Sequence, residues 1–569
     1  MESQHSKLYS YIVIFLILIH FLLAVTSIIQ KSTTSDEALH IAAGYSYLTE
    51  NDFRYNKEHP PLIKEIAAFP LLFLNLSLEK GGAWDNAYEW VAGNEFLFEN
   101  NVDADIILFW ARLPMVFLSL ILAFFIFKFA SELYGRKAGL FALFLYSFSP
   151  NILANAIIVQ TDLPAALIIL VGIYYFRKLL LEPNLKNVLV NGLVFGLALS
   201  IKFTTVYLLI FYIILFLIFI FYKKYKLKRE NKTYEILKLQ NIIKFIKYSV
   251  IILIISLIIL FIVYGFNFSG LFNNEVKENF SKQFPFSGAV YNILKFVPAP
   301  DSYVEGLRMV SRQSQTGYRA YLMGQYKKGG WPYYFPVAFL IKTPIAVLLF
   351  ITLTLIFFRK TKNNLMDELF LLIPALLYFL FFIPSQLNIG LRHILPVYPF
   401  IFIFVSKLIN LPFKSHRQKP PTTRPLFILI LILGTWYLIA SIMSYPHYLA
   451  YFNEIVSPDY GQNFLLDSNI DWGQDLKGLA KYLEKNNIKD KIWLSYWGND
   501  DPDYRNINYE FYRRIMDENS VCQPVKGYIA VSVNHLIGMK EYEAHCFDWL
   551  RKYEPITKIG YSIWVYKIE

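Results

Sequence analysis

Two pairs of polar residues near the amino terminus have the types and spacing of a site for proton transfer beside a membrane. Asp36 and Glu37 stand side by side just after the apolar run 11–29. About twenty residues later, Glu58 and His59 precede a rigid Pro-Pro pair. A carboxylate within hydrogen-bond reach of a hydroxyl can accept its proton. The pattern therefore indicates Asp36 as a candidate general base at the boundary between a span and water.

The acidic pair also has a structural interpretation, because carboxylates in the first turn of a helix are stabilised by the helix dipole. Apolar residues recur at helical spacing from Ala38 to Leu48 and predict an amphipathic helix there. Asp36 would then be its N-cap. Glu37 would either contact a substrate or favour the helix terminus.

Basic residues stand at the predicted ends of several apolar runs, where charged residues are otherwise scarce: Arg112, Lys202 and Arg392, the last followed by His393. Arginine can bind a phosphate with two parallel hydrogen bonds, whereas lysine acts as a point charge. Arg112 lies just inside a span and needs a partner, for which a loop carboxylate is the natural candidate. The alternative for each is anchoring in the lipid headgroups.

The elements that must position these residues are membrane helices. The 569 residues are 55% hydrophobic and only 17% charged, with a mean hydropathy of +0.38, whereas soluble domains carry about a quarter charged residues. Repeated apolar runs match a hydrocarbon core of roughly 30 Å. Eleven spans are predicted, at about 10–29, 106–131, 138–158, 163–180, 188–201, 204–222, 249–268, 337–358, 369–384, 394–409 and 425–444.

Lys and Arg set the predicted orientation. With the N-terminus inside the cell and a break at Lys202, the basic loops all face the cytoplasm. The loop 223–247 alone carries nine Lys or Arg against two Glu. The tail 445–569 then lies outside the cytoplasm, with 14 basic and 18 acidic residues. The net charge of +12 marks the cytoplasmic face and indicates no nucleic-acid partner. The first span could instead be a cleaved signal peptide.

The soluble mass is thus predicted on one side, in outer loops at 31–105 and 269–336 and in the tail 445–569. In the first loop a second surface helix begins at the Pro-Pro pair and runs to about Leu76. The tail alternates strands and helices and predicts a small α/β domain beyond the membrane module 1–444. Its helices are expected at about 474–485 and 538–552, and its strands at 491–497, 527–533 and 560–568. Cys522 and Cys546 both fall in this domain, where a disulfide is one of two outcomes.

Short motifs spread in order along the chain resemble a known family. They are the acidic pair, the His-Pro-Pro-Leu stretch, 110-WARLP-114, 160-QTDLP-164, 200-SIKFT-204, 329-GGWPYYFPVAFLIKTP-344, 388-NIGLRHILPVYP-399 and 467-DSNIDWGQDL-476. The chain resembles the polyprenyl-phosphate-sugar-dependent glycosyltransferases of the GT-C class, specifically the protein O-mannosyltransferase and aminoarabinose-transferase group, glycosyltransferase family 39.

The resemblance implies inverting transfer of a sugar from an undecaprenyl or dolichyl phosphate to an acceptor hydroxyl at the outer face of the cell membrane. It implies Asp36 as the base and places Glu58 and Asp162 near the reaction site. Where relatives carry a phosphate-contacting lysine, this chain has His59, which could bind phosphate or a metal. Some relatives bind a divalent metal and others need none, so metal dependence is undecided.

Positive charge must stabilise the departing lipid phosphate, for which Arg112, Lys202 and Arg392 are the candidates. Lys342, before Thr343 and Pro344, would either contact the carrier lipid or mark a packing kink. Asp467, Asp471 and Asp475 recur at four-residue spacing and either face an acceptor or are structural.

Two other classes of protein remain as alternatives: a transporter or flippase of lipid-linked sugars, and a non-catalytic membrane scaffold. Transporters usually keep ionisable residues near the middle of the membrane, whereas here they gather at its outer boundary. The expected partners are the donor, membrane lipids and a glycan, lipid or protein acceptor. The chain has no obvious sugar-binding domain in an internal loop, which weakens the case for a protein acceptor.

Overall fold

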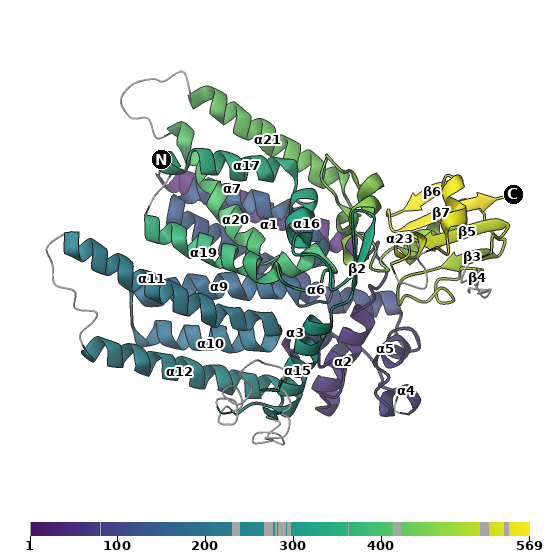
Figure 1. Cartoon of the computed structure of the whole chain (residues 1–569), viewed down its shortest axis with the longest axis horizontal. Helices are drawn as coiled ribbons and strands as arrows, with labels where there is room; N and C mark the ends of the chain where they lie inside the picture. Colours follow the sequence, from purple (N-terminus) through teal and green to yellow (C-terminus); the bar gives the residue numbers. More distant parts are fainter. Residues whose placement is uncertain are drawn as a thin grey trace.

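The computed structural model describes residues 2–569 with gaps at 80, 230–238, 267–276, 279–280, 283–291, 293–297, 362–363, 414–422, 513–522 and 540–544. Parts of the predicted loops 223–247 and 269–336, and Cys522, therefore lie outside the described residues. Long helices form one body, and a small sheet lies at the end away from the N-terminus (Figure 1). The predicted fold class, a polytopic α-helical membrane protein with a C-terminal α/β domain, is confirmed.

All eleven apolar segments are helical. Seven described helices are long and apolar enough to cross a membrane, and two bent pairs raise the number of spans to nine. The other two predicted spans are shorter helices, one of them 17 residues or about 25 Å long. The helices are α1 (Glu2–Ile28), α6 (Ala104–Tyr134), α7 (Arg136–Ser147), α8 (Pro150–Ala156), α9 (Asp162–Leu181), α10 (Leu185–Ile201), α11 (Tyr207–Arg229), α12 (Leu239–Val263), α16 (Tyr334–Lys342), α17 (Ile345–Ile356), α19 (Leu365–Phe382), α20 (Val397–Ser406) and α21 (Thr423–Met443).

Two breaks that the sequence predicts lie at the ends of helices. Lys202 is extended (φ −153°, ψ 142°) between α10 and the short helix η2 (Phe203–Val206). Pro344 separates α16 from α17, which meet at 106°. Because neither residue continues a helix, the chain can turn there and leave Lys202 and Lys342 at the ends of helices.

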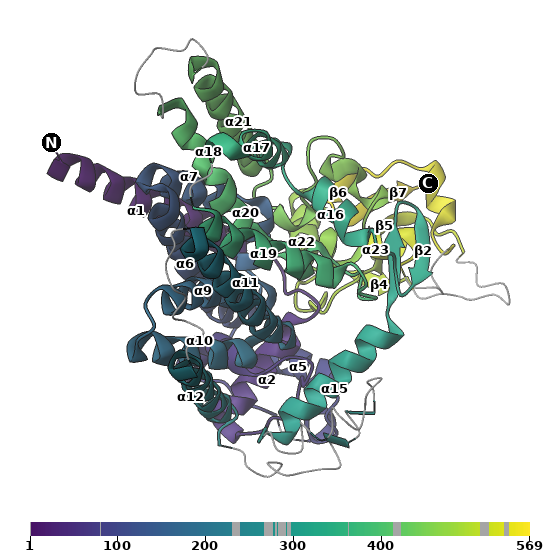
Figure 2. The same ribbon diagram turned by 60° about the vertical axis from the view of Figure 1, so that its left-hand side comes forward.

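Short elements cover the ends of the spans opposite the N-terminus of α1. The predicted helix after Asp36 is α2 (Glu37–Glu50), and the predicted helix after the Pro-Pro pair is α3 (Leu62–Ala68), which tightens into η1 (Phe69–Phe73). Two further helices follow, α4 (Gly82–Asp85) and α5 (Glu89–Phe98). Later in the chain, α15 (Asp301–Thr316) runs from these helices toward the hairpin β1 (Arg319–Leu322) and β2 (Gln325–Lys328) (Figure 2).

The C-terminal domain is a five-stranded mixed sheet in the order β4-β3-β5-β7-β6. The strand β3 pairs in parallel with β4 and β5, and β7 pairs antiparallel with β5 and β6. The strands are β3 (Ile492–Ser495), β4 (Tyr509–Phe511), β5 (Gly527–Ser532), β6 (Thr557–Ile559) and β7 (Ile563–Ile568). The helix α22 (Leu476–Lys485) buries Leu476, Leu479 and Leu483 in the core of this domain.

The predicted helix 538–552 is wrong in its described part, while 540–544 lie outside the described residues. The chain instead forms α23 (Val533–Ile537), which ends at Gly538 with φ +84°, and a 3-10 turn, η10 (Asp548–Lys552). Glycine tolerates this left-handed conformation and commonly terminates helices. The sequence also did not predict β4 and β6, which are only three residues long. Cys546 is disulfide-bonded.

Glycines allow α10 and α12 to pack closely. A Cβ atom added at Gly196 would lie 2.7 Å from Cβ of Ile259 and 2.9 Å from Cα of Ser256. Small residues are the usual means by which membrane helices approach one another. The close contact of α10 and α12 therefore depends on the absence of a side chain at this position.

We expect Gly196→Ala to lower the free energy of unfolding by about 1–3 kcal/mol, because the added methyl group overpacks the helix contact. Thermal unfolding in detergent measures the change. Gly434→Ala in α21 is the matched control, since its Cβ would meet only a Phe144 ring atom at 3.8 Å. Equal unfolding temperatures for the two variants would contradict the expectation.

Candidate active site

A buried ion pair between Glu37 and Arg112 anchors the first outer loop. Arg112 Nε donates to Glu37 Oε1 at 2.9 Å, and Nη2 donates to Oε2 at 2.6 Å. The guanidinium also donates to the carbonyl oxygens of Ile28, Lys31 and Ser32. Both side chains are 1% exposed or less. Arg112 thus has the loop carboxylate partner that its sequence position required, and its five N–H groups all have acceptors.

Glu37 is held from several sides. Besides Arg112, its carboxylate accepts hydrogen bonds from the backbone and hydroxyl of Thr34 and from the backbone N–H of Val159. Burial alone would raise the pKa of Glu37, but the charge of Arg112 and these hydrogen bonds outweigh burial and lower it. Glu37 is therefore an ionised carboxylate that joins α2 to α6 and to the segment before α9.

Asp36, the neighbouring residue, has a different environment. Its side chain is 31% exposed, and its Oδ2 lies 3.8 Å from Nη1 of Arg392. The same nitrogen lies 3.7 Å from Oδ2 of Asp162. Arg392 thus stands between two carboxylates that come from distant parts of the chain. Its backbone lies in η4 (Leu391–Ile394), just before α20.

Asp162 and Lys202 form the second close ion pair of the site. Lys202 Nζ lies 2.5 Å from Asp162 Oδ1, and both side chains are at most 7% exposed. The break at Lys202 and the start of α9 at Asp162 bring them together. Arg392 lies above the ring of Trp472, with 4.0 Å between its guanidinium carbon and the ring centre. Its Nε is buried and has no hydrogen-bond partner among the described residues.

The loop before the Pro-Pro pair places Glu58 and His59 at the same site. Gln313 from α15 donates to Glu58 Oε1 at 2.5 Å. Burial raises the pKa of the Glu58 carboxyl, and Asp36 adds to the rise. Burial, with Lys202 and other nearby cations, holds the pKa of His59 well below its usual value. His59 is therefore uncharged at neutral pH and can offer a hydrogen bond but no positive charge to a phosphate.

A lysine that sequence reasoning missed supports this loop. Lys64 Nζ donates to the carbonyl oxygens of Asn56 and His59 at 2.6 and 2.8 Å, and to the Tyr47 hydroxyl at 2.9 Å. It is 1% exposed, and burial lowers the pKa of its ammonium group to about 7. The only sequence signal was a lysine, next to Glu65, on a mostly apolar surface helix.

Two other candidate residues lie deeper. Lys342 Nζ donates to the carbonyl oxygens of Leu449 and Asn469, so it braces backbone beneath the site. His393 points between the rings of Phe335 and Phe382, and its Nε2 has no partner among the described residues. Lys342 is 2% exposed, and the hydrogen bonds that it makes leave it next to backbone rather than near Asp36.

The first residues of the C-terminal domain bind the loop that carries Asp36. The backbone N–H groups of Ser32 and Ser35 donate to the carbonyl oxygens of Gln474 and Trp472, each at 2.9 Å. Lys31 Nζ lies 2.5 Å from Asp475 Oδ1. Burial would raise the pKa of Asp475, but Lys31 and His447 outweigh burial and lower it to about 2. The 467–476 motif is therefore partly a clasp between the two domains.

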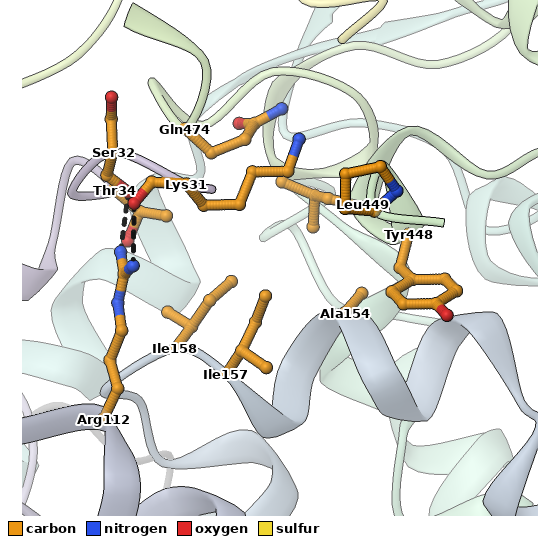
Figure 3. Close-up of a pocket in the computed structure, with 11 residues that line it drawn as sticks. Lys31, Ser32, Thr34, Arg112, Ala154, Ile157, Ile158, Tyr448, Leu449 and Gln474 are labelled. Carbon is orange, nitrogen blue, oxygen red and sulfur yellow. Dashed lines mark hydrogen bonds between the residues drawn. The ribbon is translucent and has the colours of Figure 1, made fainter. Parts of the chain in front are cut away.

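A small pocket lies behind this clasp, on the side of Arg112 (Figure 3). Ala154 of α8, with Ile157 and Ile158 just after that helix, lines one wall, and the side chain of Lys31 extends along another. Within the described residues, no group of three or more His, Cys, Asp or Glu gathers closely enough to hold a metal ion.

The charged groups of the candidate site gather at one end of the membrane-type helices, and comparison with known proteins indicates the class of protein. Residues 104–249, about a quarter of the chain, match the family model of dolichyl-phosphate-mannose-protein mannosyltransferase. This match confirms the predicted resemblance to glycosyltransferase family 39 and the predicted class of enzyme, a glycosyltransferase that depends on a lipid-phosphate sugar. No curated protein matches the chain.

Solved structures with a similar course of the chain include two of ArnT from Cupriavidus metallidurans. One is bound to undecaprenyl phosphate (10% identity, TM-score 0.43) and one is in the apo state (11%, 0.45), and each comparison covers 97% of both chains. A third is the apo oligosaccharyltransferase of Archaeoglobus fulgidus, with 12% identity and a TM-score of 0.46 over 77% of this chain and 56% of that one.

We expect Glu37→Gln to lower the free energy of unfolding by about 3–5 kcal/mol, because it leaves the buried charge of Arg112 without its counterion. Thermal unfolding in detergent measures this. Asp52→Asn is the control: its partner Arg54 is 51% exposed, and exposed ion pairs contribute at most about 1 kcal/mol. A Glu37→Gln variant as stable as Asp52→Asn would show that the buried pair does not anchor the loop.

Proposed function

We propose that the protein transfers a sugar, with inversion, from an undecaprenyl or dolichyl phosphate to an acceptor hydroxyl at the extracytoplasmic face of the membrane. Asp36 is the general base. The observation that carries the proposal is the position of Asp36, partly exposed and 3.8 Å from Arg392, while Glu37 beside it is buried and fully paired. A base needs access to its substrate, and of the two acids Asp36 has it.

The reaction follows from this arrangement. Asp36 accepts the proton of the acceptor hydroxyl as its oxygen attacks the anomeric carbon. The bond from that carbon to the phosphate oxygen breaks, and the electron pair leaves with the lipid phosphate. Attack from the face opposite the phosphate inverts the anomeric centre. Negative charge grows on the departing phosphate, and fixed cations at that point lower the barrier.

Arg392 and Lys202 supply that charge. Arg392 touches its two carboxylates only at 3.7 and 3.8 Å. Its Nε–H has no partner among the described residues, so the side chain can turn toward a phosphate. Lys202 is tied more closely to Asp162, at 2.5 Å. Asp162 therefore positions the two cations. The N–H groups of Arg112 bind Glu37 and backbone carbonyls, and the ammonium group of Lys342 binds backbone carbonyls. Both residues therefore have a supporting role and do not contact the phosphate.

Glu58 and His59, from the loop before α3, are the remaining candidates for contact with the substrate. With a raised pKa, Glu58 can hold a proton and donate a hydrogen bond to a sugar or phosphate oxygen. The uncharged ring of His59 has a buried Nδ1 without a partner in the described part of the chain, and this nitrogen is free for a hydrogen bond. The acceptor is a glycan, a lipid or a protein hydroxyl, and membrane lipids surround the helices.

Asp36→Asn should abolish transfer, because an amide cannot take up the hydroxyl proton at neutral pH. The purified protein, in lipid nanodiscs, is incubated with a panel of radiolabelled polyprenyl-phosphate sugars and a membrane extract as acceptor. We expect a loss of at least 100-fold, at the lower end of what general-base catalysis contributes. The exposed Asp459→Asn is the matched control. Equal turnover by wild type and Asp36→Asn would remove Asp36 as the base, and no turnover of any donor by wild type would favour a scaffold or flippase.

The proposed orientation places the N-terminus in the cytoplasm and the C-terminal domain outside. In intact cells, a membrane-impermeant maleimide should label a cysteine introduced at the exposed Lys489 but not one at the exposed Lys360. Lys489 belongs to the C-terminal domain, and Lys360 follows α17 on the opposite side. Labelling of the second position only would reverse the topology and overturn the proposed site of the reaction.

A further inference from the structure

Asp467 is a carboxylate of the C-terminal domain that lies beside the reaction site. It begins η8 (Asp467–Asn469), which packs directly on η4: Leu391 N–H donates to Asn469 Oδ1 at 3.0 Å, and Ser468 Oγ donates to the Ile389 carbonyl at 2.7 Å. Four residues after η8 begins, Asp471 is fully buried, and Trp472 then stacks on Arg392. The segment 467–472 thus wraps around the element that presents Arg392.

Only one of the two carboxylate oxygens of Asp467 accepts a hydrogen bond within the described residues. Its Oδ1 accepts the Ser468 N–H at 2.6 Å, while its Oδ2 makes no hydrogen bond within the described residues. The side chain is half-buried. Burial raises the pKa of Asp467 to about 6, Arg392 opposes that rise and Asp36 adds to it. The packing of η8 on η4 places Asp467 close to the element that carries Arg392.

The backbone at Asp467 is strained. Its φ is +59°, a left-handed conformation that residues with a side chain rarely adopt and that asparagine or glycine tolerates better. The backbone N–H is fixed by a hydrogen bond of 2.8 Å to Asn534 Oδ1. Strain of this kind is often kept where it aims a side chain at a functional site.

We propose that Asp467 contacts the substrate, with its free oxygen accepting a hydrogen bond from a hydroxyl group next to the one that reacts at Asp36. This inference rests on the proposed function. The hydroxyl belongs either to the acceptor or to the sugar of the donor, since the chemistry of the contact is the same. The C-terminal domain would then supply one wall of the reaction site and help to select polyhydroxylated substrates.

The test uses the full-length protein in nanodiscs and two variants, Asp467→Asn and Asp467→Gly. Both residues tolerate the left-handed backbone. Asparagine can keep the hydrogen bond from the Ser468 N–H, so Asp467→Asn should unfold near the wild-type temperature, whereas glycine relieves strain but loses that bond. Transfer from the polyprenyl-phosphate sugar that wild type uses to the membrane extract should fall at least tenfold in both, because a hydrogen bond to a charged group is lost. Asp459→Asn, in the same domain, is the control with unchanged transfer.

Equilibrium binding of the radiolabelled donor separates the two sources of the hydroxyl. A tenfold loss of donor affinity assigns the contact to the donor sugar, and unchanged donor affinity with reduced transfer assigns it to the acceptor. Transfer within threefold of wild type in either variant overturns the inference, because both variants lose the carboxylate oxygen that is proposed to bind the hydroxyl. Asp36→Asn is measured in parallel. If that variant retains transfer, the proposed function itself has failed, whatever the Asp467 variants show.

Discussion

A guanidinium group with no access to water fixes the chain where it leaves its first membrane helix. Removing the charge of Arg112 from water carries a large cost, which is offset only if every N–H finds an acceptor. Glu37 and three backbone carbonyls meet this demand. Since Glu37 cannot turn without leaving a buried charge unpaired, the backbone of Asp36 is fixed as well. The accessible acid thus owes its position to the inaccessible one beside it.

The charges around Arg392 are balanced, and this balance bears on how an anion could enter. Two carboxylates, Asp36 and Asp162, face two cations, Arg392 and Lys202. The short Lys202–Asp162 pair is buried, whereas the two contacts of Arg392 are longer than a hydrogen bond. An incoming phosphate therefore displaces little when it pairs with Arg392. The ring of Trp472 stacks on the face of the Arg392 guanidinium. The N–H groups at the edge of the guanidinium can therefore change partners while its plane stays in place.

The sequence was sufficient for features that depend on local patterns. Apolar runs predicted the helical segments, Lys202 predicted the break after α10, and Pro344 predicted the bend between α16 and α17. It also predicted that Arg112 needs a carboxylate. The candidate roles of Asp36, Glu58, His59 and the basic residues remain predictions.

The sequence could not predict which residues far apart in the chain come into contact. Which acid would meet Arg112 depended on packing between α2 and α6, and nothing local distinguishes Glu37 from Asp36. Lys64 was missed because its partners are backbone carbonyls, which leave no signal in a sequence. The helix expected at 538–552 failed because Gly538 ends α23. The role of the 467–476 motif as a clasp depends on hydrogen bonds to Ser32 and Ser35, more than 400 positions earlier.

That clasp makes the C-terminal domain a poor candidate for exchange between related chains. Its sheet has its own core, and by that criterion it looks like an independent module. Yet Trp472 and Gln474 accept hydrogen bonds from the loop that carries Asp36, and Asp475 neutralises Lys31. A chimera joined at the end of α21 would separate these partners. Recombination that alters the outer domain would have to carry the segment 31–36 with it, so the two regions are expected to change together.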